Sequence, residues 1–190
     1  PSVPFAERQN IIMKNVIVIS SSLRKKSNSE SLCDYFAKGA KDAGNAVEII
    51  NLKDKELSFC KGCLACQSIG KCVINDSANE IADKMEKADV IVFASPVYYY
   101  SISGQLKTLI DRVNCLYSRN YKFRDIYFLS TAAEDERETF EGAEKAIQGW
   151  IDCFERAELK GSVYCGGVND GGDIKDNAAL KKAYEMGKNV

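Results

Sequence analysis

The stretch VIVISSSLRKKSNS, residues 16–29, contains the pattern that decides the fold. Four consecutive β-branched residues are typical of a strand buried on both faces, and the serine-rich loop after them leads into a helical pattern. Similar apolar runs follow at residues 47–50, 90–94, 126–129 and 162–165. Helical patterns occur at residues 28–43, 77–88, 103–117, 137–157 and 177–188. Strands and helices therefore alternate along the chain.

Five successive strand–helix units predict an α/β fold, because parallel strands need crossover helices that cover both faces of the sheet. We expect a three-layer α/β/α sandwich around a five-stranded parallel sheet in the flavodoxin-like order 2-1-3-4-5. Residues 13–190 are expected to form one domain with an irregular insertion at residues 53–75, and residues 1–12 an N-terminal extension. Capping boxes predict helix starts at Ser27 with Glu30 and at Ser77 with Glu80.

The amino-acid composition excludes several classes of partner and of catalytic site. The 190 residues include 26 basic and 27 acidic side chains, so the net charge of −1 lacks the positive potential of a nucleic-acid or anionic-membrane binder. The chain has no histidine, which excludes nucleophile systems that use a histidine base and zinc sites that use imidazole. We therefore expect small-molecule partners and neither a nucleic acid nor a membrane.

The eight cysteines divide into two groups. A chain with a full hydrophobic core needs no disulfide staples, so we expect a reducing, cytoplasmic compartment. Four scattered cysteines are predicted to be small buried hydrophobes, namely Cys33, Cys115, Cys153 and Cys165. The other four lie within thirteen residues of the insertion.

The loop after the first strand is a candidate phosphate site. Ligands of a doubly wound sheet bind beyond the carboxyl ends of its strands, and N–H groups at a helix start favour an anion. Serine hydroxyls, the Asn28 amide and the Arg24 guanidinium add donors there. Because G-x-G-x-x-G and Walker A motifs are missing from the sequence, the loop favours a mononucleotide. A solvated, well-capped loop is an equally good interpretation of this stretch alone.

The loop after the third strand carries three consecutive tyrosines, residues 98–100. Their flat, amphipathic rings suit stacking on a planar ligand, and they suit packing against a neighbouring subunit equally well. The loop after the fourth strand, residues 130–134, is small and polar enough for backbone to approach a ring edge.

Cys60, Cys63, Cys66 and Cys72 form a C-x2-C-x2-C-x5-C motif in the insertion. Thiolates at this spacing can hold a 4Fe-4S cubane, and the interleaved Gly62 and Gly70 permit tight turns. Structural zinc generally uses two knuckles separated by a longer spacer, so zinc is disfavoured. A cluster and four bare thiols both remain open.

Two of these stretches resemble the NADPH-dependent FMN reductase family. Residues 21–29 are similar to its G-S-P-R-x-x-x-N-[ST] phosphate loop, and residues 95–112 to its S-P-x-Y...x-L-K...x-D-R segment. The cysteine spacing resembles the iron-sulfur flavoproteins, a branch that holds one 4Fe-4S cluster beside FMN, although relatives with a similar loop and no cluster exist. Ser21 and Leu23 replace the usual glycine and proline, and Ala132-Ala133 stands where glycine is common.

The resemblance implies an FMN site, and the iron-sulfur branch implies a cluster. It places the FMN phosphate at Ser22, Arg24, Ser27, Asn28 and Ser29. It places the isoalloxazine against Pro96, Val97, Tyr98 and Tyr99, with a lesser contribution from Ser130 and Thr131. It also implies a homodimer or homotetramer.

We expect an FMN-dependent oxidoreductase that takes electrons from NAD(P)H or a reduced carrier such as ferredoxin. A small-molecule or protein acceptor would receive them, through the cluster where one is present. The cofactor carries such chemistry, which suits a chain without histidine. The alternative is a binding module without turnover, either a flavodoxin-like electron carrier or a metal-stapled interaction domain. The sequence assigns no catalytic residue.

Overall fold

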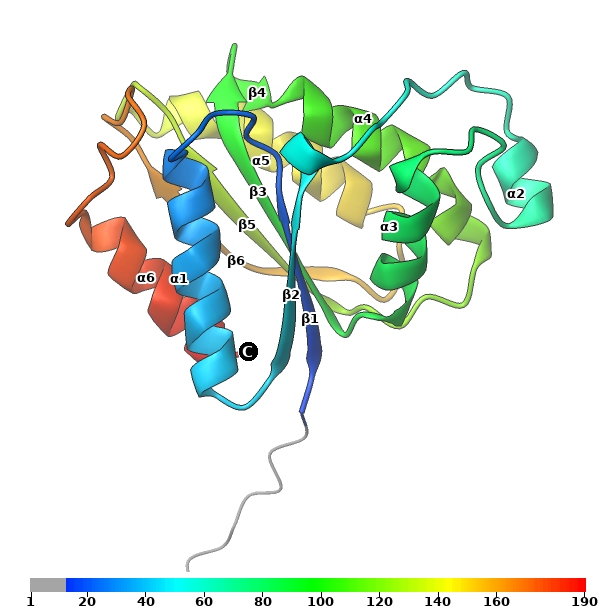
Figure 1. The fold of residues 1–190 in the computed structure, drawn as a ribbon, viewed down its shortest axis with the longest axis horizontal. Helices are drawn as coiled ribbons and strands as arrows, with labels where there is room; N and C mark the ends of the chain where they lie inside the picture. The colour runs from blue at the N-terminus through cyan, green and yellow to red at the C-terminus, as the bar shows by residue number, and fades with distance from the viewer. Residues whose placement is uncertain (1–12) are drawn as a thin grey trace, which may run out of the picture.

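A parallel sheet of five strands runs through the middle of the molecule (Figure 1). The computed structural model describes residues 13–190, and the predicted N-terminal extension, residues 1–12, lies outside the described residues. The strand order is β2 (Ala46–Asn51), β1 (Asn15–Ser20), β3 (Val90–Tyr98), β5 (Asp125–Thr131) and β6 (Glu158–Cys165). With the short β4 (Ser101–Ile102) set aside, this is the predicted order 2-1-3-4-5. The sequence analysis missed β4, which pairs antiparallel with the end of β3.

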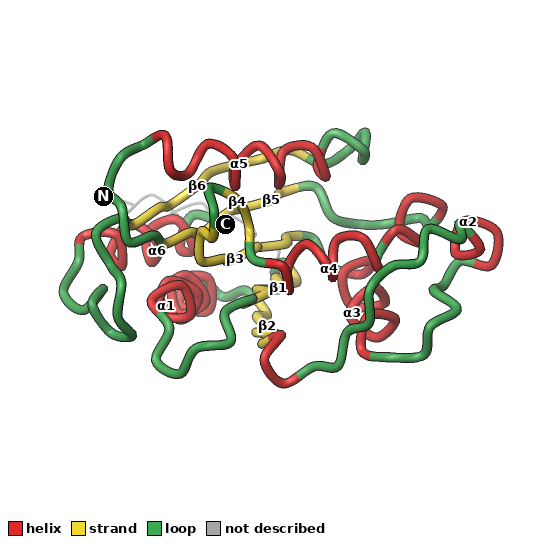
Figure 2. Tube along the Cα trace, turned by 90° about the horizontal axis from the view of Figure 1, so that it is seen from above, coloured by secondary structure: helices red, strands yellow, loops and turns green. Residues whose placement is uncertain are grey.

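Helices cover both faces of the sheet, as predicted. α1 (Asn28–Asp42) and α6 (Ala178–Lys188) pack on one face. The opposite face is covered by α3 (Ser77–Lys87), α4 (Gly104–Arg112) and α5 (Glu138–Ile151). The short elements η1 (Leu52–Asp54), α2 (Ala65–Ile69) and η2 (Asn114–Ser118) complete the chain. Figure 2 shows α2 at one end of the molecule, beyond α3 and α4, with α1 and α6 toward the other end.

The middle strands are buried along most of their length. β1 and β5 are buried except at their first residues, and β3 except at its last three. The expectation of strands apolar on both faces is wrong for the two edge strands, since exposed and partly buried residues alternate along β2 and through the first half of β6. The edge position explains this, because each of these strands has a pairing partner on one side only.

One of the two predicted helix caps is confirmed and the other is wrong. Ser27 caps α1, and its hydroxyl accepts a hydrogen bond from the Glu30 N–H. The cap of α3 is Asp76 rather than Ser77, because the Asp76 carboxylate accepts from the Ala78 N–H. The carboxylate is a stronger acceptor than the serine hydroxyl one residue later.

Two helices are shorter than the patterns predicted. The helix expected at 103–117 ends at Arg112 and continues, after Val113, as the 3-10 turn η2, and the helix expected at 137–157 ends at Ile151. Cys33, Cys115 and Cys165 are buried as predicted, but Cys153 is exposed. Its position two residues beyond the end of α5 explains the error, because periodicity does not extend past a helix end. Among the helices of residues 13–190, none combines the length and apolarity that a bilayer span requires.

Candidate functional site

A cavity of about 220 Å³ opens beyond the carboxyl ends of β1, β3 and β5. Four segments far apart in the sequence line it, and three of them carry predicted binding residues. Its lining comprises Ser22, Arg24, Ser27, Asn28, Pro96, Val97, Tyr98, Thr131, Ala132, Ala133, Val168 and Asn169. The fold therefore gathers most of the predicted FMN residues at one place, which is where a doubly wound sheet binds its ligands.

The start of α1 supplies the polar end of this cavity. Ser27 is the N-cap, and its hydroxyl shares a hydrogen bond of 3.0 Å with the Ser29 hydroxyl. The Ser22 hydroxyl accepts from the Arg24 N–H at 3.3 Å. The helix dipole and the unpaired N–H groups of the first turn favour an anion here, and the Arg24 side chain adds a positive charge.

A loop that the sequence analysis did not assign to the site forms the outer wall. Arg24 Nη1 donates to the Asn169 carbonyl at 2.6 Å. The Asn28 amide donates to the Asp170 carbonyl at 2.9 Å and accepts from the N–H groups of Gly172 and Ile174 at 3.0 and 3.2 Å. Asn28 thus holds residues 170–174 against the phosphate loop in addition to facing the cavity. No local pattern signals these contacts, since the partners lie more than 140 residues apart.

Three predicted residues do not line the cavity. Ser29 and Ser130 are buried, the first beneath the Ser27 cap and the second within β5. Tyr99 is 100% exposed at the tip of the hairpin that joins β3 to β4. The match to the family motifs did not distinguish residues that face the cavity from residues that support it.

The tyrosine hairpin has an unusual backbone. Tyr98 pairs with Ser101, which leaves Tyr99 and Tyr100 as a two-residue turn with φ angles of 49° and 60°. Such turns favour glycine or asparagine, so two tyrosines here are strained. A hydrogen bond to the Glu134 carboxylate raises the pKa of Tyr100. Both rings are exposed, so they are accessible to a ligand or to a neighbouring subunit.

A second hollow of about 310 Å³ adjoins the first beneath the hairpin. It shares Val97, Ala132 and Ala133 with the first cavity and adds Tyr99, Tyr100, Glu134 and Thr139. Small-molecule sites generally have volumes of about 300–1,000 Å³. The two hollows together fall within this range. The first is lined by the phosphate loop and the second by aromatic rings.

Two other hollows are as large but less suited to a ligand of this kind. One of about 340 Å³ follows the first halves of β1 and β2 and the end of α3, away from the carboxyl ends. Another of about 310 Å³ lies between β6 and the start of α6. Neither hollow is lined by residues of the phosphate loop, 21–29, or of the tyrosine hairpin, 98–101.

Buried serine hydroxyls tie the cavity to α4. Ser103, the N-cap of α4, donates from its hydroxyl to the Ser21 hydroxyl at 2.8 Å, and Ser21 donates to the Ala94 carbonyl at 2.9 Å. The Ser95 hydroxyl accepts from the Ser103 N–H at 2.8 Å. Ser21, which departs from the family pattern, therefore has a structural role that a glycine could not fill.

The four cysteines of the insertion line one small pocket at the other end of α4. This pocket shares no lining residue with the cavity. A helix of nine residues is about 13 Å long, so α4 separates the two sites by that order. Leu64, Gly62 and Gly70 have positive φ angles, and the resulting turns fold the motif around the pocket.

Three of the four sulfurs accept hydrogen bonds. Cys60 Sγ accepts from the Gly62 N–H at 3.4 Å, Cys66 Sγ from Asn114 Nδ2 at 3.4 Å, and Cys72 Sγ from Arg112 Nε at 3.2 Å. Within residues 13–190, no group of three cysteine or carboxylate side chains converges closely enough to hold a single metal ion. All eight cysteines are free thiols.

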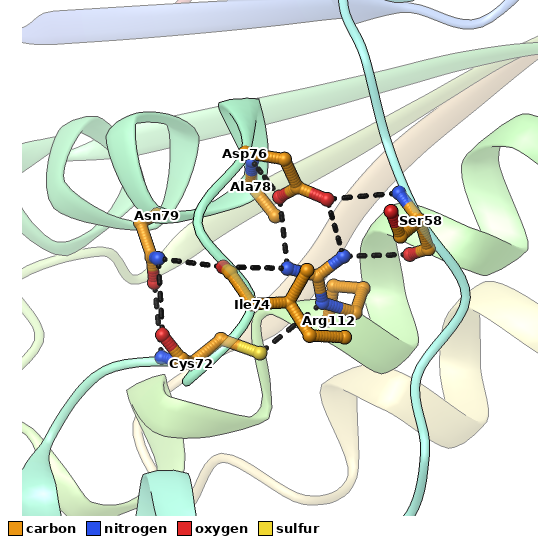
Figure 3. A network of polar contacts seen from close by, with 7 residues as sticks. All are labelled: Ser58, Cys72, Ile74, Asp76, Ala78, Asn79 and Arg112. Carbon is orange, nitrogen blue, oxygen red and sulfur yellow. Dashed lines mark hydrogen bonds and ion pairs between the residues drawn. The ribbon is translucent and has the colours of Figure 1, made fainter.

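Arg112 is the centre of a polar network that holds the cysteine loop (Figure 3). Its side chain is fully buried and forms a two-pronged ion pair with Asp76 at 2.7 and 2.8 Å. It also donates to the carbonyls of Ser58 at 2.6 Å and Ile74 at 3.2 Å. With the bond to Cys72 Sγ, all five N–H donors of the guanidinium are used.

Electrostatics keeps Asp76 ionised. Burial alone would raise the pKa of Asp76, but hydrogen bonds from Arg112 and from the N–H groups of Ser58 and Ala78 outweigh it and lower the pKa. Arg119 holds the other side of the loop, because its Nε donates to the Gly70 carbonyl at 2.6 Å. Cys115 lies buried nearby, and desolvation raises the pKa of its thiol.

Comparison with known proteins identifies the family. Residues 14–151 match the NADPH-dependent FMN reductase family. The chain belongs to this family. The resemblance to this family is thereby confirmed.

The curated relatives of this FMN reductase family member include iron-sulfur flavoproteins. One from Methanocaldococcus jannaschii is 44% identical over 97 residues, 51% of this chain and 50% of that protein. Another from Methanosarcina thermophila is 29% identical over 175 residues, 90% of this chain and 91% of that protein. The match thus spans about half the length of the first relative and nearly all of the second.

Solved structures confirm the fold class. The NAD(P)H:quinone oxidoreductase from Methanothermobacter marburgensis has a TM-score of 0.74 at 19% identity, covering 94% of this chain and 96% of that one. The FMN-dependent NADH-azoreductase from Bacillus anthracis, in complex with FMN, has a TM-score of 0.67 at 19% identity, covering 93% and 98%. Identity this low supports the fold alone.

Proposed function

We propose that the protein is an FMN-dependent oxidoreductase that takes electrons from NAD(P)H or a reduced carrier and passes them to a small-molecule or protein acceptor. The observation that carries this proposal is the cavity beyond β1, β3 and β5, where the phosphate loop and the tyrosine loop meet. Membership of the NADPH-dependent FMN reductase family supports the same cofactor and the same donor.

The residues present fit FMN. Arg24 and the first turn of α1 would neutralise and bind the phosphate, with the hydroxyls of Ser22 and Ser27 as further donors. Pro96, Val97 and Tyr98 would bound the ring on one side, and Thr131 and the small residues after it on the other. FMN, when bound, supplies transfer of two electrons as a hydride or of single electrons.

The second hollow is where we place the nicotinamide or the acceptor. It adjoins the proposed ring position and is lined by Tyr99, Tyr100 and the apolar Val97, which suit a flat substrate ring. The protein's own contribution there is to orient the ring and exclude water. The chain has no histidine, so the titratable side chains that line this hollow are Glu134 and the two tyrosines.

We further propose that Cys60, Cys63, Cys66 and Cys72 hold a 4Fe-4S cluster. The donor set fits, because four thiols line one pocket and three of their sulfurs already accept N–H groups, which is the environment that stabilises bound thiolates. A cubane takes one thiolate per iron, so its ligands lie further apart than those of a single ion. The iron-sulfur flavoprotein relatives support this assignment.

Several broader expectations remain proposals. Residues 13–190 would act as one FMN-binding domain in a reducing, cytoplasmic compartment, consistent with eight free thiols. A homodimer or homotetramer would cover the exposed tip of the tyrosine hairpin, where Tyr99 is bare in the single chain. We propose no nucleic acid and no membrane as partner, as the balanced charge suggests.

An absorbance spectrum of anaerobically purified protein, before and after NADPH, tests the function. We expect flavin bands over a broad iron–sulfur background, and loss of the flavin bands when NADPH is added. If a reduced carrier bleaches the yellow protein and NADPH does not, the carrier is the electron donor. A yellow protein that neither donor bleaches supports the electron-carrier alternative, and a colourless protein that retains zinc contradicts the proposal.

A further inference from the structure

Two side chains at the corner between α4 and η2 point their N–H groups at cysteine sulfurs. Arg112 Nε lies 3.2 Å from Cys72 Sγ, and Asn114 Nδ2 lies 3.4 Å from Cys66 Sγ. Both belong to a helix-and-turn segment that is remote in sequence from the C-x2-C-x2-C-x5-C motif. The motif alone therefore does not reveal them.

The Arg112 contact carries a full positive charge into the buried wall of the pocket. The guanidinium is 1% exposed, and its charge is shared between the Asp76 carboxylate and the Cys72 sulfur (Figure 3). Hydrogen bonds from a charged donor are roughly twice as strong as neutral ones. This donor consequently favours negative charge on the sulfur it faces.

The Asn114 contact is neutral and separable from the rest of the network. Among the described residues, the Asn114 side chain forms a single hydrogen bond, which goes to Cys66 Sγ. Removing it therefore changes one sulfur without touching the Arg112–Asp76 pair. This separation makes Asn114 the cleaner of the two positions to vary.

We propose that Arg112 and Asn114 are positioning residues of the metal site, whose N–H groups raise the reduction potential of the cluster that the four cysteines hold. The inference rests on the proposed cluster. Each electron added to a cluster places more negative charge on its sulfurs, so donors to those sulfurs stabilise the reduced form more than the oxidised one. Loss of a donor should make the potential more negative.

Asn79 provides the matched control. Its side chain accepts from the Cys72 N–H at 2.9 Å and donates to the carbonyls of Cys72 and Ile74, both at 3.1 Å. These hydrogen bonds hold the backbone of the same cysteine, and none of them goes to a sulfur. A residue that only shapes the loop should behave as Asn79 does.

The test is an anaerobic redox titration with dithionite as the one-electron reductant, followed by electron paramagnetic resonance of the reduced cluster. Iron is counted in each preparation. Asn114→Ala removes the donor, and Asn114→Asp replaces it with a carboxylate of the same size. Arg112→Lys keeps the charge but lacks the five-donor fork, and Asn79→Ala is the control.

We expect the reduction equilibrium of Asn114→Ala to shift about tenfold toward the oxidised cluster, which is about 59 mV for one electron. Asn114→Asp should shift further in the same direction, and Arg112→Lys at least as far as Asn114→Ala. Asn79→Ala should lower the iron content while the clusters that remain keep the wild-type potential. This pattern supports the inference.

Two results overturn it in distinguishable ways. Clusters at the wild-type potential in both Asn114 variants and in Arg112→Lys, whatever their iron content, leave these residues with a merely structural role and refute the inference alone. Wild-type protein that contains flavin but no iron, and that resists reconstitution with iron and sulfide, refutes the proposed cluster and the inference with it.

Discussion

Replacing Arg112 by methionine is expected to lower the free energy of unfolding by about 3 kcal/mol. The change keeps an aliphatic side chain but removes all five N–H donors and leaves the Asp76 carboxylate, whose side chain is 8% exposed, without its counter-charge. Removing one partner of a buried ion pair costs about 3–5 kcal/mol. We take the lower end because the N–H groups of Ser58 and Ala78 still hold the carboxylate.

The effect should depend on pH in a definite direction. The pKa of Asp76 lies below its ordinary value of 3.8 in the folded protein, so the pair contributes stability above that value. The contribution is lost as pH falls through the lowered folded pKa. The difference in unfolding free energy between the wild type and Arg112→Met should therefore be complete at pH 7 and shrink below about pH 4.

Urea unfolding followed by circular dichroism measures this difference. Both proteins should be stripped of cofactors in reductant, so that ligand binding adds nothing to the free energy. Lys107→Met is the control on the same helix, because Lys107 forms an exposed ion pair with Asp111 that contributes only about 0.3–0.5 kcal/mol. A loss for Arg112→Met no larger than that of the control would refute the reasoning.

Four further changes separate the two sites. Arg24→Ala should weaken FMN binding about 10- to 100-fold by fluorescence titration, since a charge-assisted hydrogen bond contributes about 1.5–3 kcal/mol; unchanged affinity would place the phosphate elsewhere. Replacing both Tyr98 and Tyr99 by leucine should shift the flavin spectrum and slow its reduction, and an unaltered spectrum and rate would assign these rings to a subunit interface. Cys66→Ser should remove most of the iron while FMN is retained, because the pockets share no residue; joint loss of both would contradict this independence. Gly142→Ala should push the tip of the tyrosine hairpin off α5 and slow flavin reduction, whereas Gly149→Ala, with open space at that position, should not.

Much of the fold follows from local patterns in the sequence. The β-branched runs predict the five parallel strands because strands buried on both faces are apolar throughout, and the middle strands confirm it. The hairpin strand β4 escaped prediction, since its turn uses two tyrosines where glycine or asparagine is expected. The cap of α3 was misplaced by one residue because the Asp76 carboxylate, a stronger acceptor than the Ser77 hydroxyl, caps the helix instead.

The binding motifs of the candidate site could be predicted from the sequence, whereas the residues that hold them in place could not. The phosphate loop and the tyrosine loop follow strands that end at the same edge of the sheet, so their meeting follows from topology. The wall formed by residues 168–169 and the Arg112 network depend on contacts across more than 30 residues of sequence. Such contacts carry no periodic or motif signal, and only the folded chain reveals them.

We propose that the loop before α1 binds the phosphate of FMN. Titration of the flavin-free protein with FMN and with riboflavin, followed by flavin fluorescence, isolates that phosphate because the two ligands share the same ring and ribityl chain. We predict that FMN binds at least tenfold more tightly than riboflavin and that Arg24→Ala removes most of the difference. Equal affinity of the wild type for FMN and riboflavin would show that the loop before α1 does not bind the phosphate.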